Sequence, residues 1–491
     1  MAKVYGIDLG TVNSCIACLD EFGQADLIPN SMGNRTTPSV VYFSPDGQSY
    51  TVGEIAKNGM VSDHASTVSC IKREMGTVYT KPTGFPRGLT PAEISSYILK
   101  TLVKEANAAE EARGEKPCFD VVITCPAYFG SDERKQTREA GQLAGLNVLR
   151  LINEPTAAAI AYGLKHCRDG KEQYILVYDL GGGTFDVTLV RLCGKSFKAI
   201  ATGGDKQLGG KDWDLCLAEK LLQEFNRKTG SSYSFDGNVA LLNHFMLIAE
   251  DTKHSLSSKS SVQTNVGWDG KSTLLQINGR DFEKWTEHLL EKTITATRDV
   301  LAQAERKNVR LTADTTVVLV GGSTKMPQVI RRLEQEFASA GCKILKRSPE
   351  ECVAKGAAQI GDIIEEPSDI TFYDVSSKTY GTDAKKQGDS TEYVRNLIFA
   401  NTELPARSEI IFHTAVPNQE AVSLKIFESN SLQKTIPVSE AKVIDGVHTL
   451  KLPPNLPAHT EITVFFELDC QGVLHVQAKT ESSDVCFEVN I

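Results

Sequence analysis

The sequence lacks a long apolar run. No hydrophobic stretch among its 491 residues approaches the ~20 residues that a membrane-spanning helix needs. The N-terminus, MAKVYGIDLG, carries a single Lys and then a strand-like pattern, without the apolar centre of a signal peptide. We therefore expect no membrane as a partner and predict a soluble, cytoplasmic protein.

The sequence also lacks an excess of basic residues, because 53 Lys and Arg face 62 Asp and Glu and the formal net charge is -9. A chain without a basic stripe attracts a phosphate backbone poorly, so nucleic acid is not an expected partner. The twelve cysteines are scattered, which predicts reduced thiols rather than a disulfide framework. Cys15 and Cys18 form a C-x-x-C, but the strand-like alternation of NSCIACL puts them on opposite faces and disfavours a metal or redox site.

What is present up to about residue 364 is an alternation of strand and helix patterns, which predicts an α/β architecture. Strands are expected at 3–9, 14–19, 120–125, 174–179, 186–192 and 315–320. Helices are expected at 91–111, at 132–144 with Ser131 as the N-cap and Gly145 at the stop, and from Asn153 with Pro155 in the first turn. From about residue 370 only short alternating runs follow, which predicts an all-β sandwich.

Two segments share one pattern of strand, Asp, Gly-containing turn and second strand: VYGIDLGTVNSCIACL (4–19) and LVYDLGGGTFDVTLV (176–190). Such a repeat predicts two similarly folded lobes that face each other. Glycines let backbone N–H groups close on a phosphate, and the Asp of each copy could hold Mg²⁺ through water. The positions concerned are Asp8, Gly10, Thr11, Val12 and Asn13 in the first copy and Asp179, Gly181, Gly182, Gly183 and Thr184 in the second.

A single Gly-rich hairpin is more often a plain tight turn, but two copies with an Asp in each favour a clamp for a polyphosphate. A third glycine turn, in VVLVGGSTKMPQVIRRL, joins a strand to a helix at Gly321 and Gly322. Its helix N-terminus could receive a phosphate or a nucleoside, although such a junction alone is more often structural.

Seven stretches together resemble the ATPase domain of the Hsp70 (DnaK-like) chaperone family: IDLGTVNS, IKREMG, TCPAYFGSDERKQTREAGQLAGLNVLRLINEPTAAAIAYGL, DLGGGTFDVTLV, GDKQLGGKDWD, EDTKHSLSS and VLVGGSTKMP. The resemblance covers about residues 1–364, and the rest is similar to the family's substrate-binding domain more loosely. It implies an actin/hexokinase-like two-lobed ATPase domain (1–364), a linker (365–371) and a β-sandwich peptide-binding-like domain (372–491). It also implies hydrolysis of ATP to ADP and phosphate with Mg²⁺, and it allows K⁺ as a further cofactor.

The family pattern assigns roles to individual residues. Asp8 and Asp179 would hold Mg²⁺ through water, while Thr11 and Thr184 would contact phosphates. Lys72 would stabilise charge at the γ-phosphate, Glu154 would lie near the attacking water, and Asp186 would support the site. Without the resemblance, Lys72 reads as a surface lysine and Glu154 as a helix-start acid. The remaining ATP-binding positions implied are Gly10, Val12, Asn13, Gly181, Gly182, Gly183, Gly209, Gly210, Glu250, Lys253, His254, Ser257, Gly321, Gly322, Ser323, Lys325 and Glu350.

The sequence departs from the family at the nucleotide pocket. Val12 stands where the family usually has a second Thr, so one hydroxyl is missing. His254 and Lys325 stand where the family has two arginines that sandwich adenine, and Glu350 replaces an Asp. Lys cannot stack a flat guanidinium on a base, so we expect ATP binding weaker than is typical of the family.

In the β region, Phe412, Ala415, Val422 and Leu424 match positions that line or arch over the family's peptide groove. The loop 382–393 is more polar than the corresponding groove loop, and the apolar residues fit a plain sandwich core equally well. The sequence ends at Ile491, where the family's helical lid would begin. The lid is therefore expected to be missing, either naturally or through truncation.

Partners follow from the resemblance: an unfolded or extended polypeptide, a J-domain co-chaperone near Arg150 and Asn153, and a nucleotide exchange factor. We expect an ATP-dependent chaperone that uses hydrolysis to control the binding of extended polypeptide. The alternative is a lidless regulatory or scaffolding relative whose nucleotide state recruits one specific protein. A sugar kinase or an actin-type filament accounts for neither the β region nor the run of motifs.

Overall fold

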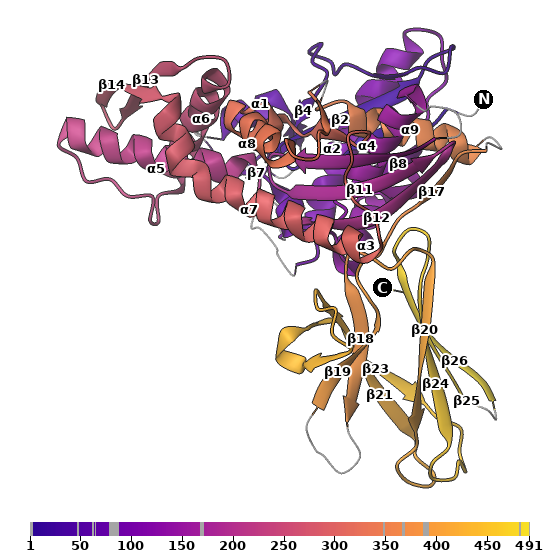
Figure 1. Cartoon of the computed structure of the whole chain (residues 1–491). Helices are drawn as coiled ribbons and strands as arrows, with labels where there is room; N and C mark the ends of the chain where they lie inside the picture. The colour runs from indigo at the N-terminus through magenta and orange to yellow at the C-terminus, as the bar shows by residue number, and fades with distance from the viewer. Residues whose placement is uncertain are drawn as a thin grey trace.

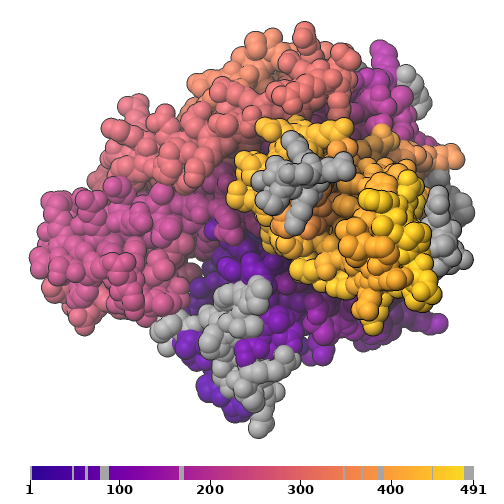
Figure 2. Space-filling model, turned by 90° about the horizontal axis from the view of Figure 1, so that it is seen from below, coloured from indigo at the N-terminus to yellow at the C-terminus, as the bar shows by residue number. Residues whose placement is uncertain are grey.

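The computed structural model describes residues 3–46, 49–60, 63, 65–77, 88–166, 171–346, 349–365, 369–385, 392–480 and 483–490. Two α/β lobes lie side by side, and a β region (residues 369–490) hangs beneath them in the view of Figure 1. Figure 2 shows that the β region lies against the underside of both lobes. The fold class predicted from the sequence, a two-lobed α/β part followed by an all-β sandwich, is confirmed.

The first lobe (residues 3–166) is built on a six-stranded sheet of order β3-β2-β1-β8-β9, with β4 paired to β2. Cys15 packs with Ala17 on one face of β2, and Cys18 packs with Ile16 on the other, as the alternation predicts. The elements of this lobe are β1 (Tyr5–Asp8), β2 (Asn13–Leu19), β3 (Ala25–Leu27), β4 (Thr37–Pro38), β5 (Val40–Phe43), β6 (Tyr50–Val52), α1 (Glu54–Gly59), β7 (Thr67–Ser69), the 3₁₀ helix η1 (Ile71–Glu74), α2 (Pro91–Glu111), β8 (Asp120–Cys125), α3 (Ser131–Leu143), β9 (Asn147–Asn153) and α4 (Glu154–His166).

The second lobe (residues 171–346) carries a sheet of order β16-β15-β10-β11-β12-β17 over a core that includes Tyr178, Trp213 and Phe245. Helix α9 (Cys352–Glu365) then returns to the first lobe, where a Cβ on Gly6 of β1 would lie 2.1 Å from the Ala358 nitrogen, so only glycine fits. The elements of this lobe are β10 (Glu172–Leu180), β11 (Phe185–Cys193), β12 (Ser196–Asp205), α5 (Gly210–Thr229), α6 (Val239–Leu256), β13 (Ser261–Trp268), β14 (Lys271–Asn278), α7 (Gly279–Arg306), β15 (Thr316–Val320), η2 (Gly322–Lys325), α8 (Pro327–Phe337) and β16 (Lys343–Leu345).

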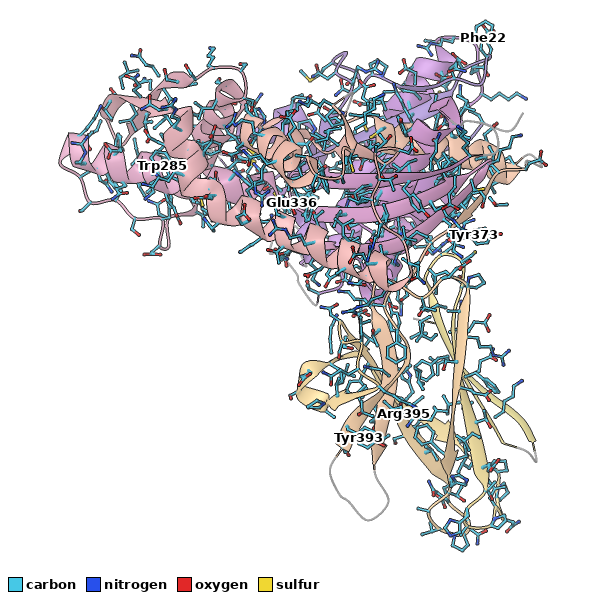
Figure 3. The ribbon with its side chains drawn as sticks, in the orientation of Figure 1. Phe22, Trp285, Glu336, Tyr373, Tyr393 and Arg395 are labelled. Atoms are coloured by element: carbon cyan, nitrogen blue, oxygen red, sulfur yellow. The ribbon has the colours of Figure 1, made fainter. Side chains whose placement is uncertain are left out.

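The β region is a sandwich of a five-stranded sheet, β22-β19-β18-β21-β23, and a four-stranded sheet, β20-β24-β25-β26. Ile426 of one sheet and Phe466 of the other are fully buried in the shared core. In Figure 3, Tyr393 and Arg395 mark β19. The elements are β17 (Thr371–Tyr373), β18 (Thr379–Lys385), β19 (Glu392–Ile398), β20 (Ala406–His413), β21 (Ala421–Ser429), β22 (Thr435–Pro437), η3 (Val438–Glu440), β23 (Lys442–Lys451), β24 (Glu461–Leu468), β25 (Leu474–Thr480) and β26 (Ser483–Asn490).

Most predicted elements are confirmed, and the errors fall at helix starts. Helix α2 has its predicted bounds, with a capping box between Thr90 and Glu93. Helix α3 is capped by Gly130 rather than by Ser131. The third predicted helix begins at Glu154, because Asn153 still belongs to β9 and pairs with Cys125 of β8.

The segment after α9 joins the second lobe as a strand. Residues 366–368 of the predicted linker lie outside the described residues, and α9 itself runs to Glu365. Strand β17 then pairs in parallel with β12, with Thr371 opposite Ser196 and Tyr373 opposite Lys198. Tyr373 lies at the junction of the lobes and the β region in Figure 3.

Hydrogen bonds tie the β region to both lobes. On the first lobe, Thr156 donates to Asp374 at 2.6 Å, and Ser377 donates to the Phe129 carbonyl at 2.8 Å. On the second lobe, the backbone N–H of Thr202 donates to the side chain of Asn401 at 2.7 Å. The β region is therefore docked, and its position depends on both lobes at once.

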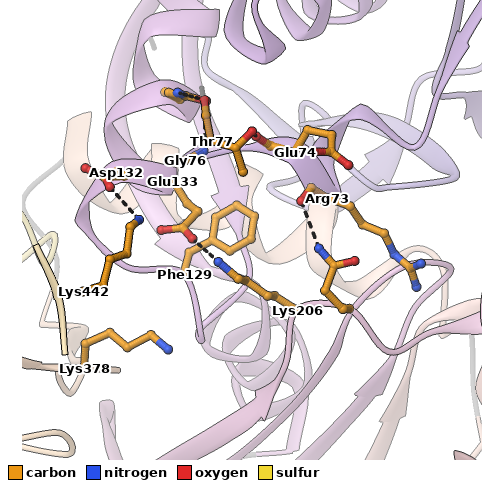
Figure 4. Close-up of polar contacts among 12 residues, drawn as sticks. Arg73, Glu74, Gly76, Thr77, Phe129, Asp132, Glu133, Lys206, Lys378 and Lys442 are labelled. Atoms are coloured by element: carbon orange, nitrogen blue, oxygen red, sulfur yellow. Dashed lines mark hydrogen bonds and ion pairs between the residues drawn. The ribbon is translucent and has the colours of Figure 1, made fainter. Parts of the chain in front are cut away.

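The first turn of α3 carries the charged part of this interface (Figure 4). Lys442 of β23 pairs with Asp132 at 2.8 Å. Glu428 of β21 is buried, and a Cβ on Gly130 would lie 2.1 Å from its Oε2. Burial and the neighbouring Glu133 raise the pKa of Glu428, although two nearby lysines oppose them. A side chain at residue 130 would therefore force the carboxylate of Glu428 to leave its present position.

Replacing Gly130 by Ala should undock the β region. The backbone of Gly130 has φ -85, which any residue adopts, so the expected effect comes from the collision with Glu428. We expect the Gly130→Ala variant to show a larger radius of gyration by small-angle X-ray scattering, and the Gly130→Ala/Glu428→Ala double variant to return to the wild-type value. An unchanged radius in the single variant would contradict this docking contact.

Docking should also depend on pH through Glu428. The pKa of Glu428 is raised in the docked state, so the protonated carboxyl favours docking. This stabilisation of the docked state is fully present below the ordinary pKa of Glu. It is lost as the pH rises through the raised pKa of Glu428. We expect the wild type to expand as the pH rises above the ordinary pKa of Glu and through the raised pKa of Glu428. Glu428→Gln should stay compact over the same titration, as judged by small-angle X-ray scattering. A Gln variant that expands as much as the wild type would sink this assignment.

Candidate active site

The two predicted glycine turns meet at a cavity of about 380 Å³ between the lobes. Most of the predicted nucleotide-binding positions line it: Asp8, Gly10, Thr11, Val12, Asn13, Lys72, Glu154, Asp179, Gly181, Gly182, Thr184, Gly210, Glu250, Lys253, His254, Ser257, Gly321, Gly322, Ser323, Lys325 and Glu350. The lining leaves out Gly183, Asp186 and Gly209. Asp186 lies behind the wall, where its carboxylate accepts from the Tyr128 backbone N–H at 3.0 Å.

The glycines of the second turn lie against side chains of the first turn. Asp8 faces Cys15 in the β1–β2 hairpin, and Asp179 faces Asp186 in the β10–β11 hairpin, so both hairpins place an Asp beside the turn. A Cβ on Gly182 would lie 2.2 Å from a Val12 methyl. A Cβ on Gly183 would lie as close to Thr11. Side chains here would push the lobes apart.

The third glycine turn is fastened to the second. Gly321 has φ +80, and a Cβ there would lie 2.3 Å from the Leu180 carbonyl. Ser323 donates to the Gly181 carbonyl at 2.9 Å. The predicted strand-to-helix junction contains η2 before α8 begins, and it closes the wall of the cavity.

The floor of the cavity concentrates buried charge. Lys72 of η1 pairs with Glu154 of α4 at 2.5 Å, with the two side chains 5% and 8% exposed. Burial and the charge of Glu154 raise the pKa of Asp8 and of Asp186 to about 7, and they raise the pKa of Asp179 as well. Burial lowers the pKa of Lys72, but Glu154 and Asp8 outweigh it and raise the pKa overall. Four carboxylates thus share one ammonium group.

This donor set fits a hard divalent cation. Carboxylate oxygens are the ligands that Mg²⁺ takes, and a cation would offset the repulsion that raises these pKa values. Within the part of the chain that the structure describes, no group of three or more His, Cys, Asp or Glu side chains is arranged to hold a metal directly. A Mg²⁺ held by Asp8 and Asp179 would therefore complete its shell with water or phosphate oxygens.

The opposite end of the cavity is lined by paired charges. Glu250 of α6 accepts from Lys57 of α1 at 3.0 Å and from Lys211 of α5 at 3.2 Å. Although burial raises it, Lys211 and Lys57 lower the pKa of Glu250 to about 2. Lys253 pairs with Asp214 at 2.7 Å. The Lys57–Glu250 pair is notable because it crosses the cleft from the first lobe to the second.

A family model described as "Hsp70 protein" matches residues 4–87 and 83–491. The chain belongs to the Hsp70 family. Members of this family are generally ATPases that bind ATP or ADP with Mg²⁺, and they generally bind unfolded polypeptides and co-chaperones. The long cavity between two lobes, with buried carboxylates at one end, agrees with this membership.

The positions where the chain departs from the usual Hsp70 pattern have structural partners. Val12 packs on Gly182 of the other turn. Lys325 pairs with Glu350 at 2.9 Å, with both side chains about half exposed. Burial and the neighbouring Lys253 lower the pKa of His254. The two substituted residues therefore differ, because Lys325 is paired with Glu350 whereas His254 favours its neutral form.

Several cavity residues escaped prediction from the sequence. These are Cys15, Thr36, Lys211, Asp214, Val320, Met326, Pro349 and Val353. Lys211 and Asp214 lie in the quoted motif GDKQLGGKDWD, immediately after Gly210, so that motif was their only signal. Cys15 and Met326 follow a predicted glycine turn, and Pro349 precedes Glu350. Only the folded chain brings the whole set together.

The predicted peptide groove and co-chaperone contact lie outside this site. Leu424 is 5% exposed in the sandwich core, while Phe412 and Val422 pack against that core and Ala415 lies on an exposed turn. The loop 382–393 falls partly outside the described residues.

Of the two residues predicted for J-domain contact, Asn153 is buried and accepts from Arg134 at 2.5 Å. Arg150 is half-buried, with its guanidinium 4.3 Å from the centre of the Phe372 ring. In the docked arrangement, therefore, Asn153 has no surface to offer a partner. Among the described residues, no helix combines the length and apolarity that crossing a membrane requires.

Removing the cross-cleft pair should speed nucleotide release. Lys57 is the first-lobe partner of the buried Glu250, so Lys57→Met removes this ion pair between the two lobes. We expect release of a fluorescent ADP analogue to accelerate about tenfold in stopped-flow measurements. Lys346→Met, which removes the exposed pair with Glu334, is the matched control and should release at the wild-type rate. Equal rates in all three proteins would contradict a role for the pair.

Proposed function

We propose that this Hsp70 family member is an ATP-driven chaperone. It hydrolyses ATP to ADP and phosphate in the cleft between the lobes, and the nucleotide state controls the grip of the β region on extended polypeptide. The observation that carries the proposal is the buried Lys72–Glu154 pair, which lies beside Asp8 and Asp179 under two glycine turns that belong to different lobes.

Each residue has a role that its surroundings support. Thr11 and Thr184, both buried at the turns, offer hydroxyls and backbone N–H groups to phosphate oxygens. Lys72 offers the one ammonium group of the charged floor to the terminal phosphate. Glu154, its partner, orients the attacking water. Phosphoryl transfer to water consists mostly of positioning and charge neutralisation, which such an array supplies.

Asp8 and Asp179 would hold Mg²⁺, whose charge would neutralise the phosphates and favour departure of the terminal one. Asp186 accepts from the Tyr128 backbone N–H and lies behind that pair. At the other end of the cavity, Glu250, Lys253 and Ser257 would receive the nucleoside, with His254 and Lys325 flanking the base. We propose that this end binds ATP more weakly than is typical of the family, because neither flanking residue carries a guanidinium.

Communication between the lobes and the β region is supported by their shared contacts. Glu154 begins α4 directly after Asn153, and Asn153 accepts from Arg134. Arg134 in turn donates to the Gln471 carbonyl of the β region at 3.3 Å. A J-domain co-chaperone and a nucleotide exchange factor would act on this coupled arrangement, the former near Arg150.

The packing of the predicted groove favours a second candidate. Leu424 lies in the sandwich core and Phe412 packs against it, so the β region can be a recognition surface without a general peptide groove. The chain would then act as a regulatory or scaffolding relative whose nucleotide state recruits one specific protein.

Single-turnover hydrolysis of ATP, with and without an unfolded peptide, separates the two candidates. We expect the wild type to hydrolyse, Lys72→Ala to lose activity by at least about 100-fold, and peptide to accelerate the wild type. Lys220→Ala, at a partly exposed lysine of α5, is the control and should match the wild type. Hydrolysis that ignores peptide would favour the scaffold. If no Lys72-dependent hydrolysis is found, the proposed ATPase activity is overturned.

A further inference from the structure

Arg73 bridges the cleft at its phosphate end. Its Nε donates to the Gly183 carbonyl at 2.8 Å, and its two terminal nitrogens lie 3.4 and 2.5 Å from the two carboxylate oxygens of Asp212. Arg73 belongs to η1 of the first lobe, whereas Gly183 and Asp212 belong to the second. One guanidinium therefore holds the second glycine turn and the start of α5 together from the opposite side of the cleft.

The partners of Arg73 are themselves fixed. Asp212 accepts from the Gly209 backbone N–H at 2.8 Å and so closes the first turn of α5. Gly209 packs so closely on the second turn that a Cβ there would lie 2.5 Å from the Gly183 nitrogen. Thr184, the predicted phosphate contact, follows Gly183 directly. The position of this turn thus depends on what holds Gly183.

The backbone of Arg73 is fixed as well. Its carbonyl accepts from the Gln207 side chain of the second lobe at 3.2 Å, one of the bonds drawn in Figure 4. Three residues further on, the Gly76 backbone N–H donates to Gln136 of α3 at 2.9 Å. Since Lys72 precedes Arg73 in the same 3₁₀ helix, the segment that carries the buried ammonium group is tied across the cleft by both backbone and side chain.

We propose that Arg73 is a positioning residue for hydrolysis. It does not line the cavity; it holds the Gly183–Thr184 turn at a fixed distance from Lys72 while the cleft is closed. The inference rests on the proposed ATPase function and adds a residue to it. A planar fork is needed, because only a guanidinium can donate to the carbonyl and to both carboxylate oxygens at once.

The Arg73→Lys variant tests the fork, since it keeps the charge and loses the geometry. We expect the single-turnover rate to fall about 10- to 100-fold, because small displacements of reacting groups cost that much, while the Kd for ATP stays within about threefold of the wild type. Asp212→Asn keeps an acceptor for Gly209 and weakens the fork, so its rate should fall less. Arg298→Lys is the matched control: Arg298 makes the same kind of fork with Glu336 on the second lobe (Glu336 in Figure 3), away from the cavity.

Hydrogen exchange of the 181–184 amides in the presence of Mg-ATP gives a readout that is independent of turnover. We expect faster exchange in Arg73→Lys than in the wild type and no change in Arg298→Lys. A rate and an exchange pattern equal to those of the wild type would overturn the proposal, and so would a parallel loss of binding and rate. If the wild type itself fails to hydrolyse, the ATPase proposal falls, and the exchange comparison alone decides whether Arg73 holds the turn.

Discussion

Buried negative charge at the floor of the cleft is the constraint on which the rest of the molecule depends. Glu154, Asp179 and Asp186 are buried beside the partly buried Asp8, and Lys72 offsets only part of their repulsion. Such a cluster is costly unless a cation joins it. Its members come from both lobes, so any ligand that neutralises them also favours the closed arrangement of the lobes. Binding of a cation and closure of the lobes therefore both reduce the repulsion among these carboxylates.

The glycines of the site allow the two lobes to approach each other closely. The two turns can approach only because Gly182 and Gly183 offer no side chain to Val12 and Thr11. A glycine has the same effect at the interface with the β region, where Gly130 leaves room for Glu428. Cleft and interface are separated by few residues, since Glu154 and Asn153 are neighbours in sequence and face different partners. This adjacency places a residue of the cleft directly beside a residue of the chain of contacts that reaches the β region.

The sequence predicted the local parts of the site better than its long-range parts. The Asp and Gly pattern of each hairpin determines its own turn, so the positions from Asp8 to Asn13 and from Asp179 to Thr184 could be read directly. The roles of Lys211 and Arg73 could not be predicted in this way, because their hydrogen-bond partners lie 39 and 110 residues away in the sequence. The start of α3 was missed for a related reason: Ser131 is a good capping residue by type, but its hydroxyl donates to Tyr380 of the β region. Local propensity there gave way to a tertiary bond.

The pairing of β17 with β12 has a consequence for the life of the undocked protein. While β17 is in place, β12 is an interior strand of the second-lobe sheet. If the β region were to move away and take that strand with it, β12 would become an outer edge with unpaired backbone groups, which is a template for association with other chains. Lys195 precedes the paired stretch of β12 and Lys198 is its last residue, and charged side chains of this kind discourage such pairing. The chain thus places charged side chains at an edge that undocking would uncover.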